Sequence, residues 1–216
     1  MRDVYESGYG NLFPDSNLLS IVIPEIRYFQ ETRKTDESKF RILDIGCGIG
    51  SNLLIVNEFV DVLYEGIDLS KHAGEIARRR IKAMNLNQRA RIHVLSTEQF
   101  LASENESWDL ILDRASLQHH EVLHDDISRE KFLADLCSKL APEGKLVSLW
   151  AGEKNCNTDL RFSSFVPFEE IKPVFEGVLN IVSLKQISRF DLNSKQHQLV
   201  AEEYLVVAKK GTDYNV

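Results

Sequence analysis

The chain has 216 residues, of which 43% are hydrophobic and only 5 are proline. This length can bury one substantial core and is too short for two ordinary α/β domains, so we expect a single domain over residues 1–216. The formal charge of −7 and the sequence pI of about 5.4 argue against nucleic acid as a partner, because general binders of DNA or RNA are usually basic.

Cysteine usage and hydropathy favour a cytoplasmic protein. The three cysteines, Cys47, Cys137 and Cys156, are odd in number and lack the paired spacing of metal ligands, which predicts a reducing compartment and no metal site. No apolar stretch approaches membrane-spanning length, and the first residues lack the charged-then-apolar order of a signal peptide. We therefore expect no membrane partner.

Helix-like and strand-like patterns alternate along the first two thirds of the chain. An amphipathic helix is predicted over residues 16–29, interrupted or begun at Pro24, and a charged connection over 31–39 follows it. The next patterns predict a strand at 41–45, a helix at 51–59, a strand at 62–67, a helix at 71–84, strands at 91–95 and 108–113, and a helix at 128–140.

The last third has a different pattern. Residues 140–150, LAPEGKLVSLW, predict a helix stop, a turn and a fifth strand, and a short helix follows at 167–174. Residues 180–190 and 201–209 are strand-like, and their adjacency predicts an antiparallel pair at a sheet edge. Residues 211–216 are expected to form a loose tail.

The run RILDIGCGIGSN, residues 41–52, reads as a buried strand that turns through three glycines into a helix. Asp44 lies inside the apolar run, where an uncompensated charge is costly, so we expect it to face a partner near the end of the strand. The glycines allow a sharp turn and the close approach of a ligand. Ser51 or Asn52 can cap the following helix, and Cys47 is interpreted as a small packing residue within the turn rather than a nucleophile. As part of this turn, Cys47 and Asn52 are included among the predicted cofactor contacts. The alternative is a tight turn without a ligand.

The spacing of this turn separates two classes of cofactor. A dinucleotide fingerprint requires G-x-G-x-x-G, whereas here the third glycine comes one position early. Asp44 also suits a cofactor that carries an ammonium and a sulfonium better than one that carries a diphosphate.

Asp68, at the end of the second strand, supports a cofactor site independently. An acid about 20 residues after the glycine turn holds ribose hydroxyls in Rossmann-type units. We include its neighbour Leu69 among the cofactor contacts and expect Ser70 to cap the next helix. The alternative for Asp68 is a helix-capping aspartate.

At this point the chain resembles the class I S-adenosylmethionine-dependent methyltransferases, whose first motif has the form D-x-G-x-G-x-G. Four residues match the motif: Asp44, Gly46, Gly48 and Gly50. The resemblance covers about residues 41–152 and implies S-adenosylmethionine as the cofactor. The implied fold is α/β and Rossmann-like, with a seven-stranded, mostly parallel sheet, an antiparallel edge strand and helices on both faces. We divide the domain into an N-terminal lid and helix (1–39), a cofactor-binding core (40–152) and a C-terminal helix with antiparallel strands (153–210).

The residues after the third strand depart from the family pattern. Many members place an acidic residue there to meet the adenine amino group, whereas this chain has Ser96, Thr97 and Glu98. The alternative to an adenine contact is a helix cap in which Ser96 or Thr97 pairs with Glu98.

The block WDLILDRASLQHH, residues 108–120, carries the catalytic candidates. In the family this region lies under the transferred methyl group, so His119 or His120 is a candidate base for a hydroxyl acceptor. Asp113 is expected to orient the cofactor or a histidine, and Arg114 to contact the cofactor. The alternative is that one histidine packs or caps while the other faces solvent. The spacing of these histidines is not that of a recognised metal site.

The N-terminal YESGYGNLFPDSN pattern and LDRASLQHH resemble a subgroup associated with bacterial surface-polysaccharide biosynthesis. The resemblance implies a lid over the acceptor, and the alternative is a poorly ordered terminus. The candidate acceptor contacts are Tyr5, Tyr9, Asn11, Phe13, Trp150 and Arg161.

The predicted function is methyl transfer from S-adenosylmethionine to a small-molecule polar acceptor such as a sugar or sugar derivative, with O-methylation favoured. A non-catalytic cofactor-binding module is one alternative. A nicotinamide-dependent oxidoreductase is the other, and the glycine spacing argues against it.

Overall fold

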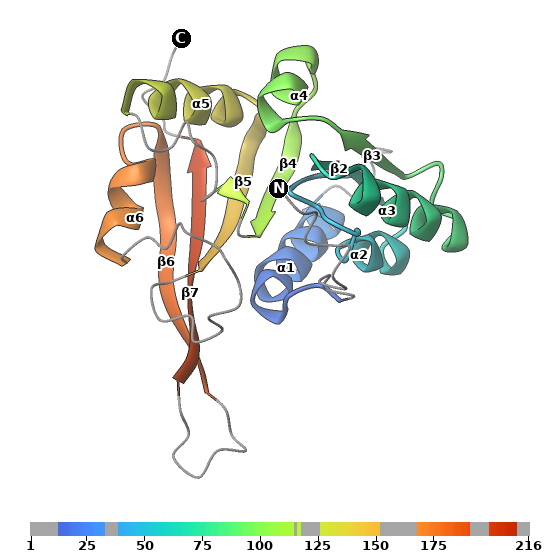
Figure 1. Cartoon of the computed structure of the whole chain (residues 1–216), viewed down its shortest axis with the longest axis horizontal. Helices are drawn as coiled ribbons and strands as arrows, with labels where there is room; N and C mark the ends of the chain where they lie inside the picture. Colours follow the sequence, from blue (N-terminus) through green and yellow to red (C-terminus); the bar gives the residue numbers. More distant parts are fainter. Residues whose placement is uncertain are drawn as a thin grey trace.

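A computed structural model describes residues 13–32, 39–114, 116–117, 126–151, 168–190 and 199–210 (Figure 1). The helices are α1 (Ser16–Thr32), α2 (Leu53–Glu58), α3 (Lys71–Ala83), α4 (Thr97–Ser103), α5 (Asp126–Ser138) and α6 (Phe168–Phe175). The strands are β1 (Phe40–Ile45), β2 (Val62–Asp68), β3 (Ala90–Val94), β4 (Trp108–Arg114), β5 (Leu140–Ala151), β6 (Leu179–Phe190) and β7 (Leu199–Lys210).

The strands form one sheet in the order β3-β2-β1-β4-β5-β7-β6. Strands β1 to β5 run parallel, and β7 is antiparallel to both β5 and β6. This arrangement confirms the predicted mostly parallel sheet with an antiparallel pair at its edge. The outermost strand of the pair is β6, so the antiparallel strand β7 lies one place inside the edge.

Helices cover both faces of the sheet, because alternate strand residues point to opposite sides. One hydrophobic core lies between helices α1, α2 and α3 and one face of the sheet. In it, Val22 of α1, Val56 of α2 and Ala77 of α3 pack with Ile42 of β1 and with other side chains on the same face. The other core joins α4, α5 and α6 to the opposite face of the same strands. The result is the three-layer α/β/α sandwich expected for this class (Figure 1).

Helix α1 runs through Pro24, which corrects the prediction that Pro24 interrupts or begins it. Proline removes one backbone hydrogen bond and costs about 3 kcal/mol inside a helix. Four apolar side chains on one face offset that cost by burial: Leu18, Val22, Ile26 and Phe29. A second correction concerns β5. The turn predicted at 141–144 is instead a bulge inside this strand, and Glu143 in the bulge has a φ of 65°.

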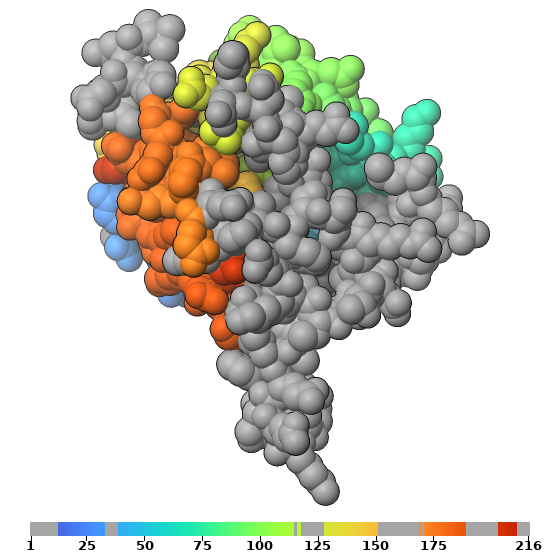
Figure 2. Space-filling view, turned by 60° about the vertical axis from the view of Figure 1, so that its left-hand side comes forward, coloured from blue at the N-terminus to red at the C-terminus, as the bar shows by residue number. Residues whose placement is uncertain are grey.

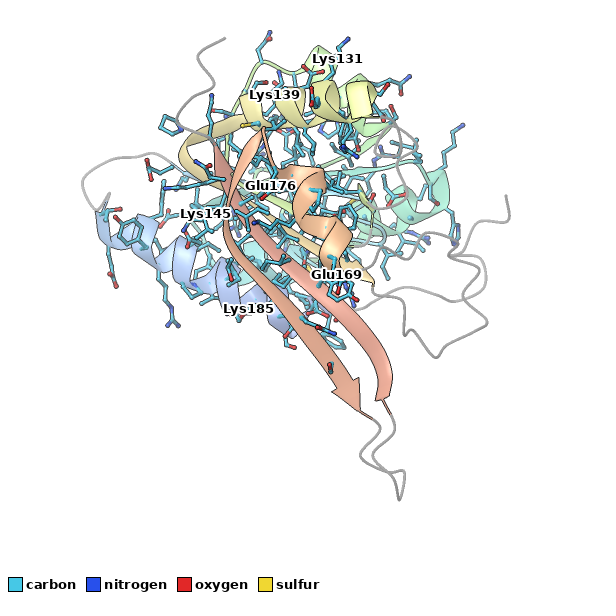
Figure 3. All side chains as sticks on the ribbon, turned by 90° about the vertical axis from the view of Figure 1, so that its left-hand side faces the viewer. Lys131, Lys139, Lys145, Glu169, Glu176 and Lys185 are labelled. Atoms are coloured by element: carbon cyan, nitrogen blue, oxygen red, sulfur yellow. The ribbon has the colours of Figure 1, made fainter. Side chains whose placement is uncertain are left out.

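The β6–β7 pair extends past the carboxyl end of β5. The last β5 residue pairs with Glu203, while β6 and β7 continue to pair as far as Phe190 and Leu199 (Figure 3). Helix α6 lies beside β6 at this edge of the molecule (Figure 1), and residues of this part of the chain form the orange surface in Figure 2. On the other face, Lys145 of β5 lies 2.6 Å from Glu25 and ties the sheet to α1.

Candidate cofactor site

The carboxyl ends of the parallel strands bring the predicted cofactor residues to one edge of the sheet. Ile45 of β1 pairs with Ile67 of β2 and with Asp113 of β4, so the ends of these three strands are level. Open α/β sheets bind ligands at this edge. The glycine turn, Asp68 and Asp113 therefore lie at a place suited to a cofactor.

The glycine turn adopts a backbone that requires glycine. Gly46, Gly48 and Gly50 have φ of 66°, 54° and 75°, in the left-handed region that other residues rarely adopt. A Cβ at Gly46 would also lie 2.4 Å from the Cβ of Ser116, in the loop after β4. The turn and the loop after β4 are thus in direct contact.

Asp44 is buried beneath this turn, with 2% of its surface exposed. Its Oδ2 accepts hydrogen bonds from the Tyr64 hydroxyl at 2.5 Å and from the Asn52 amide nitrogen at 2.9 Å. Burial raises the pKa of Asp44 from 3.8 to about 6, although both hydrogen bonds favour the ionised form. Asn52 is therefore occupied with Asp44 and makes no side-chain cap on α2, which corrects one of the two capping predictions.

Asp68 fastens the end of β2 to the glycine turn. Its Oδ2 accepts the N–H of Gly48 and its Oδ1 accepts the N–H of Ser70, each at 2.8 Å. The Ser70 side chain caps α3 by accepting the N–H of Ala73, which confirms that prediction. A carboxylate oxygen can accept more than one hydrogen bond, so these contacts leave Asp68 able to meet a ligand hydroxyl. Leu69, next in the chain, is 75% exposed at the same edge.

Cys47 is a packing residue in this turn. Its N–H donates to the carbonyl of Ile67 at 2.9 Å, and a Cβ at Gly66 would lie 2.8 Å from its Sγ. Burial, followed by the charges of Asp44 and Asp68, raises the pKa of the Cys47 thiol well above its ordinary value. A thiol in this state is a poor nucleophile.

The residues after β3 form a helix cap. Ser96 accepts the N–H of Gln99, and the Gln99 side chain accepts the N–H of Ser96, a reciprocal capping box at the start of α4. The predicted partner, Glu98, is corrected to Gln99, because the capping box joins the N-cap to the third helical residue. Thr97 is buried, and Glu98 lies in the first turn of α4.

Asp113 is fully buried and holds the loop after β4. Its Oδ1 accepts the N–H groups of Ser116 and Leu117 at 2.9 Å each, and its Oδ2 accepts the Ser148 hydroxyl. Trp150 completes this chain, since its indole N–H donates to the Ser148 oxygen at 2.6 Å. Trp150 is 1% exposed, which argues against its predicted acceptor contact and gives it a supporting role in the core.

Arg114 joins the end of β4 to the start of α1. Its guanidinium lies 3.3 Å from Asp15, whose side chain is 4% exposed. Asp15 also accepts the N–H of Asn17 at 2.8 Å, so it fixes the first turn of α1. Phe13, close to this junction in the chain, is 71% exposed. Six other predicted site residues lie outside the described residues: Tyr5, Tyr9, Asn11, His119, His120 and Arg161.

Two residues of this cluster were not predicted from the sequence. Tyr64 carries a hydroxyl within an apolar strand. Its ring lies on the α1 side of the sheet, because Tyr64 pairs with Ile42 of β1 and both belong to the core that includes α1. Ser148 lies 35 residues after Asp113, and no local pattern connects the two. Both support carboxylates that were predicted.

The described residues also bear on a metal site and on a membrane-spanning helix. Within them, no cluster of three or more histidine, cysteine or acidic side chains is arranged to hold a metal ion. None of the helices in the described part of the chain is long and apolar enough to cross a membrane.

Comparison with known proteins identifies the domain. Residues 42–144 match a family model described as "Methyltransferase domain". The phosphoethanolamine N-methyltransferase of Plasmodium falciparum (isolate 3D7) is 23% identical over 172 residues, which cover 76% of this chain and 60% of that protein. The chain thus spans somewhat less than two thirds of this relative's length.

Two solved structures share the fold. A S-adenosylmethionine-dependent methyltransferase of Methanosarcina mazei superposes with a TM-score of 0.57 at 16% identity, covering 83% of this chain and 97% of the other. The plantazolicin methyltransferase BpumL, solved with S-adenosylhomocysteine, gives 0.58 at 17% identity, covering 86% and 82%.

Together, the domain match, the strand order and the glycine turn support a methyltransferase domain with the class I fold and with S-adenosylmethionine as its cofactor. The site residues fit that cofactor. Both hydrogen bonds to Asp44 reach Oδ2, so no donor among the described residues is assigned to Oδ1. A buried carboxylate oxygen in this state suits a cationic ligand group.

Proposed function

We propose that this chain transfers the methyl group of S-adenosylmethionine to a hydroxyl of a small polar acceptor, such as a sugar or sugar derivative. The observation that carries the proposal is the contact between the glycine turn and the loop after β4, at Gly46 and Ser116. This contact puts the cofactor turn beside the segment that leads to the candidate bases, His119 and His120, two and three residues beyond Leu117.

We assign the cofactor contacts to residues at the carboxyl ends of the parallel strands. Asp44 holds the amino group through Oδ1, Asp68 holds the ribose hydroxyls, and Leu69 supplies an apolar contact for the adenine. Ser96, whose N–H and hydroxyl form the α4 cap with Gln99, is proposed to lie near the adenine. S-adenosylmethionine supplies an electrophilic methyl group on a sulfonium. Alignment of the two reactants is then the protein's main contribution.

Asp113 acts in this proposal as a positioning residue. It holds the N–H groups of Ser116 and Leu117 and fixes the start of the loop that carries the histidines. One histidine accepts the hydroxyl proton as the carbon–oxygen bond forms. The acceptor is proposed to lie against Tyr5, Tyr9, Asn11, Phe13 and Arg161, with the Arg114–Asp15 pair anchoring the N-terminal side of that pocket.

A second candidate acceptor is an amine. The similarity to a phosphoethanolamine N-methyltransferase favours it, because that protein's name specifies nitrogen as the methylated atom. We also propose a cytoplasmic location and a place in surface-polysaccharide biosynthesis, in line with the buried thiol of Cys47 and with the N-terminal pattern.

The test is a transfer assay with a radiolabelled methyl donor. Neutral sugars, sugar phosphates and phosphoethanolamine are offered in parallel, and the product is treated with base to separate ethers from esters. We expect label in a base-stable sugar ether. Label on phosphoethanolamine alone assigns the amine candidate, and a chain that binds S-adenosylhomocysteine but labels no acceptor overturns the proposed substrate class.

A further inference from the structure

The Asp44 carboxylate has two oxygens in unequal surroundings. Oδ2 receives both the Tyr64 hydroxyl and the Asn52 amide, while no hydrogen bond to Oδ1 is formed within the described part of the chain. Asn52 directly precedes α2, and Tyr64 lies in the middle of β2. The two donors therefore clamp one oxygen from two elements and fix the direction of the other.

The Tyr64 hydroxyl is a hydrogen-bond donor to Asp44. Tyr64 is 1% exposed, and burial together with the charge of Asp44 raises the pKa of its hydroxyl well above the ordinary value, so the proton stays on the oxygen. Asp44 is the carboxylate with which that proton is shared. Removal of the hydroxyl leaves Asn52 as the remaining donor to Oδ2.

We propose that Tyr64 is a positioning residue of the cofactor site: it keeps Asp44 ionised and aimed at the cofactor's amino group, and so determines the pH below which the cofactor is released. The inference rests on the proposed contact between Asp44 and the cofactor, and not on the identity of the acceptor.

The surroundings of Asp44 favour such a dependence. Burial and two neighbouring carboxylates, Asp113 and Asp68, oppose its ionisation, and the Tyr64 and Asn52 hydrogen bonds favour it. Two further titratable groups lie around Tyr64: the Cys47 thiol, and Arg80 of α3, whose guanidinium donates to the Ile49 carbonyl at 3.1 Å.

The experiment measures the affinity for S-adenosylhomocysteine by calorimetry between pH 5 and 8.5. We expect the affinity of the unchanged chain to fall by up to about tenfold per pH unit below the Asp44 titration. One lost hydrogen bond to a charged group shifts the midpoint of Tyr64→Phe upward by on the order of one pH unit. Its affinity should therefore drop about twofold at pH 7 and about fivefold at pH 6, and recover at pH 8.5.

Tyr204→Phe is the matched control, since Tyr204 is equally buried and lies in β7, in the other core. It should leave the midpoint unchanged. Asn52→Ala, which removes the second donor to the same oxygen, should shift the midpoint in the same direction as Tyr64→Phe. This variant keeps the test decisive if thermal melts show that Tyr64→Phe does not fold.

Three outcomes separate the inference from the proposed site. A midpoint that moves upward supports the role of Tyr64. If Tyr64→Phe and Asn52→Ala weaken binding equally at every pH, or leave it unchanged, the positioning role is overturned. If Asp44→Asn binds S-adenosylhomocysteine as tightly as the unchanged chain, the proposed Asp44 contact itself is overturned.

Discussion

The amino and carboxyl ends of the parallel strands form two edges of the sheet. Charged side chains are exposed and paired at the amino edge, whereas they are buried at the carboxyl edge. At the amino ends of β1 and β2, Lys39 and Asp61 pair at 2.7 Å with 43% of each side chain exposed. Arg41 pairs with Glu106 beside them. At the carboxyl ends, Asp44 and Asp113 are buried and receive hydrogen bonds from hydroxyl, amide and backbone groups.

This contrast separates a stabilising surface from a binding edge. Exposed ion pairs contribute little and are screened by salt. A buried carboxylate held by neutral donors costs stability, because the hydrogen bonds offset only part of its lost hydration. The carboxyl edge therefore retains negative charge that is available to a cationic ligand, and the amino edge does not.

The largest expected effect compares the aspartates at the two ends of β2. Asp68→Ala should lower the affinity for S-adenosylhomocysteine by on the order of a hundredfold, because charge-assisted hydrogen bonds to the ribose are lost. Asp61→Ala, at the amino end, should leave the affinity within about twofold and cost no more than about 1 kcal/mol of stability. Calorimetry measures both. Equal losses of affinity in the two variants would remove the distinction between the edges.

The next effect concerns turnover at the carboxyl edge. We expect one of His119→Ala and His120→Ala to lower turnover by on the order of a hundredfold without a change in cofactor affinity, because the base acts on the acceptor proton. The other variant should be nearly silent. Full activity in both variants would assign the histidines no catalytic role.

A third prediction separates backbone strain from crowding in the glycine turn. Gly46→Ala should destabilise the fold by about 2 to 4 kcal/mol, since it combines a left-handed φ with a contact to Ser116. Gly177→Ala, with φ 91° and nothing within 4 Å of the new Cβ, should cost only about 1 to 2 kcal/mol. Denaturant unfolding gives both values, and identical costs would mean that the Ser116 contact is unimportant.

The smallest effect is expected at a partly buried pair, Glu65 and His93, between the two ends of the strands. Glu65 lies 2.8 Å from His93, and this hydrogen bond lowers the pKa of Glu65 below its ordinary value of 4.5. A lowered carboxyl pKa stabilises the fold above the unfolded value and loses that contribution as the pH falls through the folded value. Glu65→Gln should cost under about 1 kcal/mol at pH 7 and nothing near pH 3. A cost that persists at pH 3 would contradict an electrostatic origin.

The sequence predicted the order of the elements and the position of the glycine turn, because both depend on local apolar periodicity and on glycine spacing. The sequence-based predictions failed where contacts between residues far apart in the chain determine the local structure. Pro24 stays inside α1 because the helix packs on the sheet, and Ser148 supports Asp113 only because β4 and β5 are neighbours. Tyr64 was missed for the same reason, since its partner Asp44 lies 20 residues earlier.

The most direct test of the account is the stability and cofactor affinity of Asp44→Asn. Because the folded-state pKa of Asp44 is raised from 3.8 to about 6, the folded protein binds the extra proton, and its stability falls as the pH rises between these values. Above pH 6 the ionised group costs about 3 kcal/mol. The asparagine oxygen can take the place of Oδ2 and keep both hydrogen bonds.

We therefore predict that Asp44→Asn is more stable than the unchanged chain at pH 8, by up to about 3 kcal/mol, and equal to it near pH 3.5. At pH 8 it should bind S-adenosylhomocysteine at least about tenfold more weakly. A variant that is less stable at pH 8 and binds the cofactor normally would contradict the claim that this buried carboxylate is kept for the cofactor at the expense of stability.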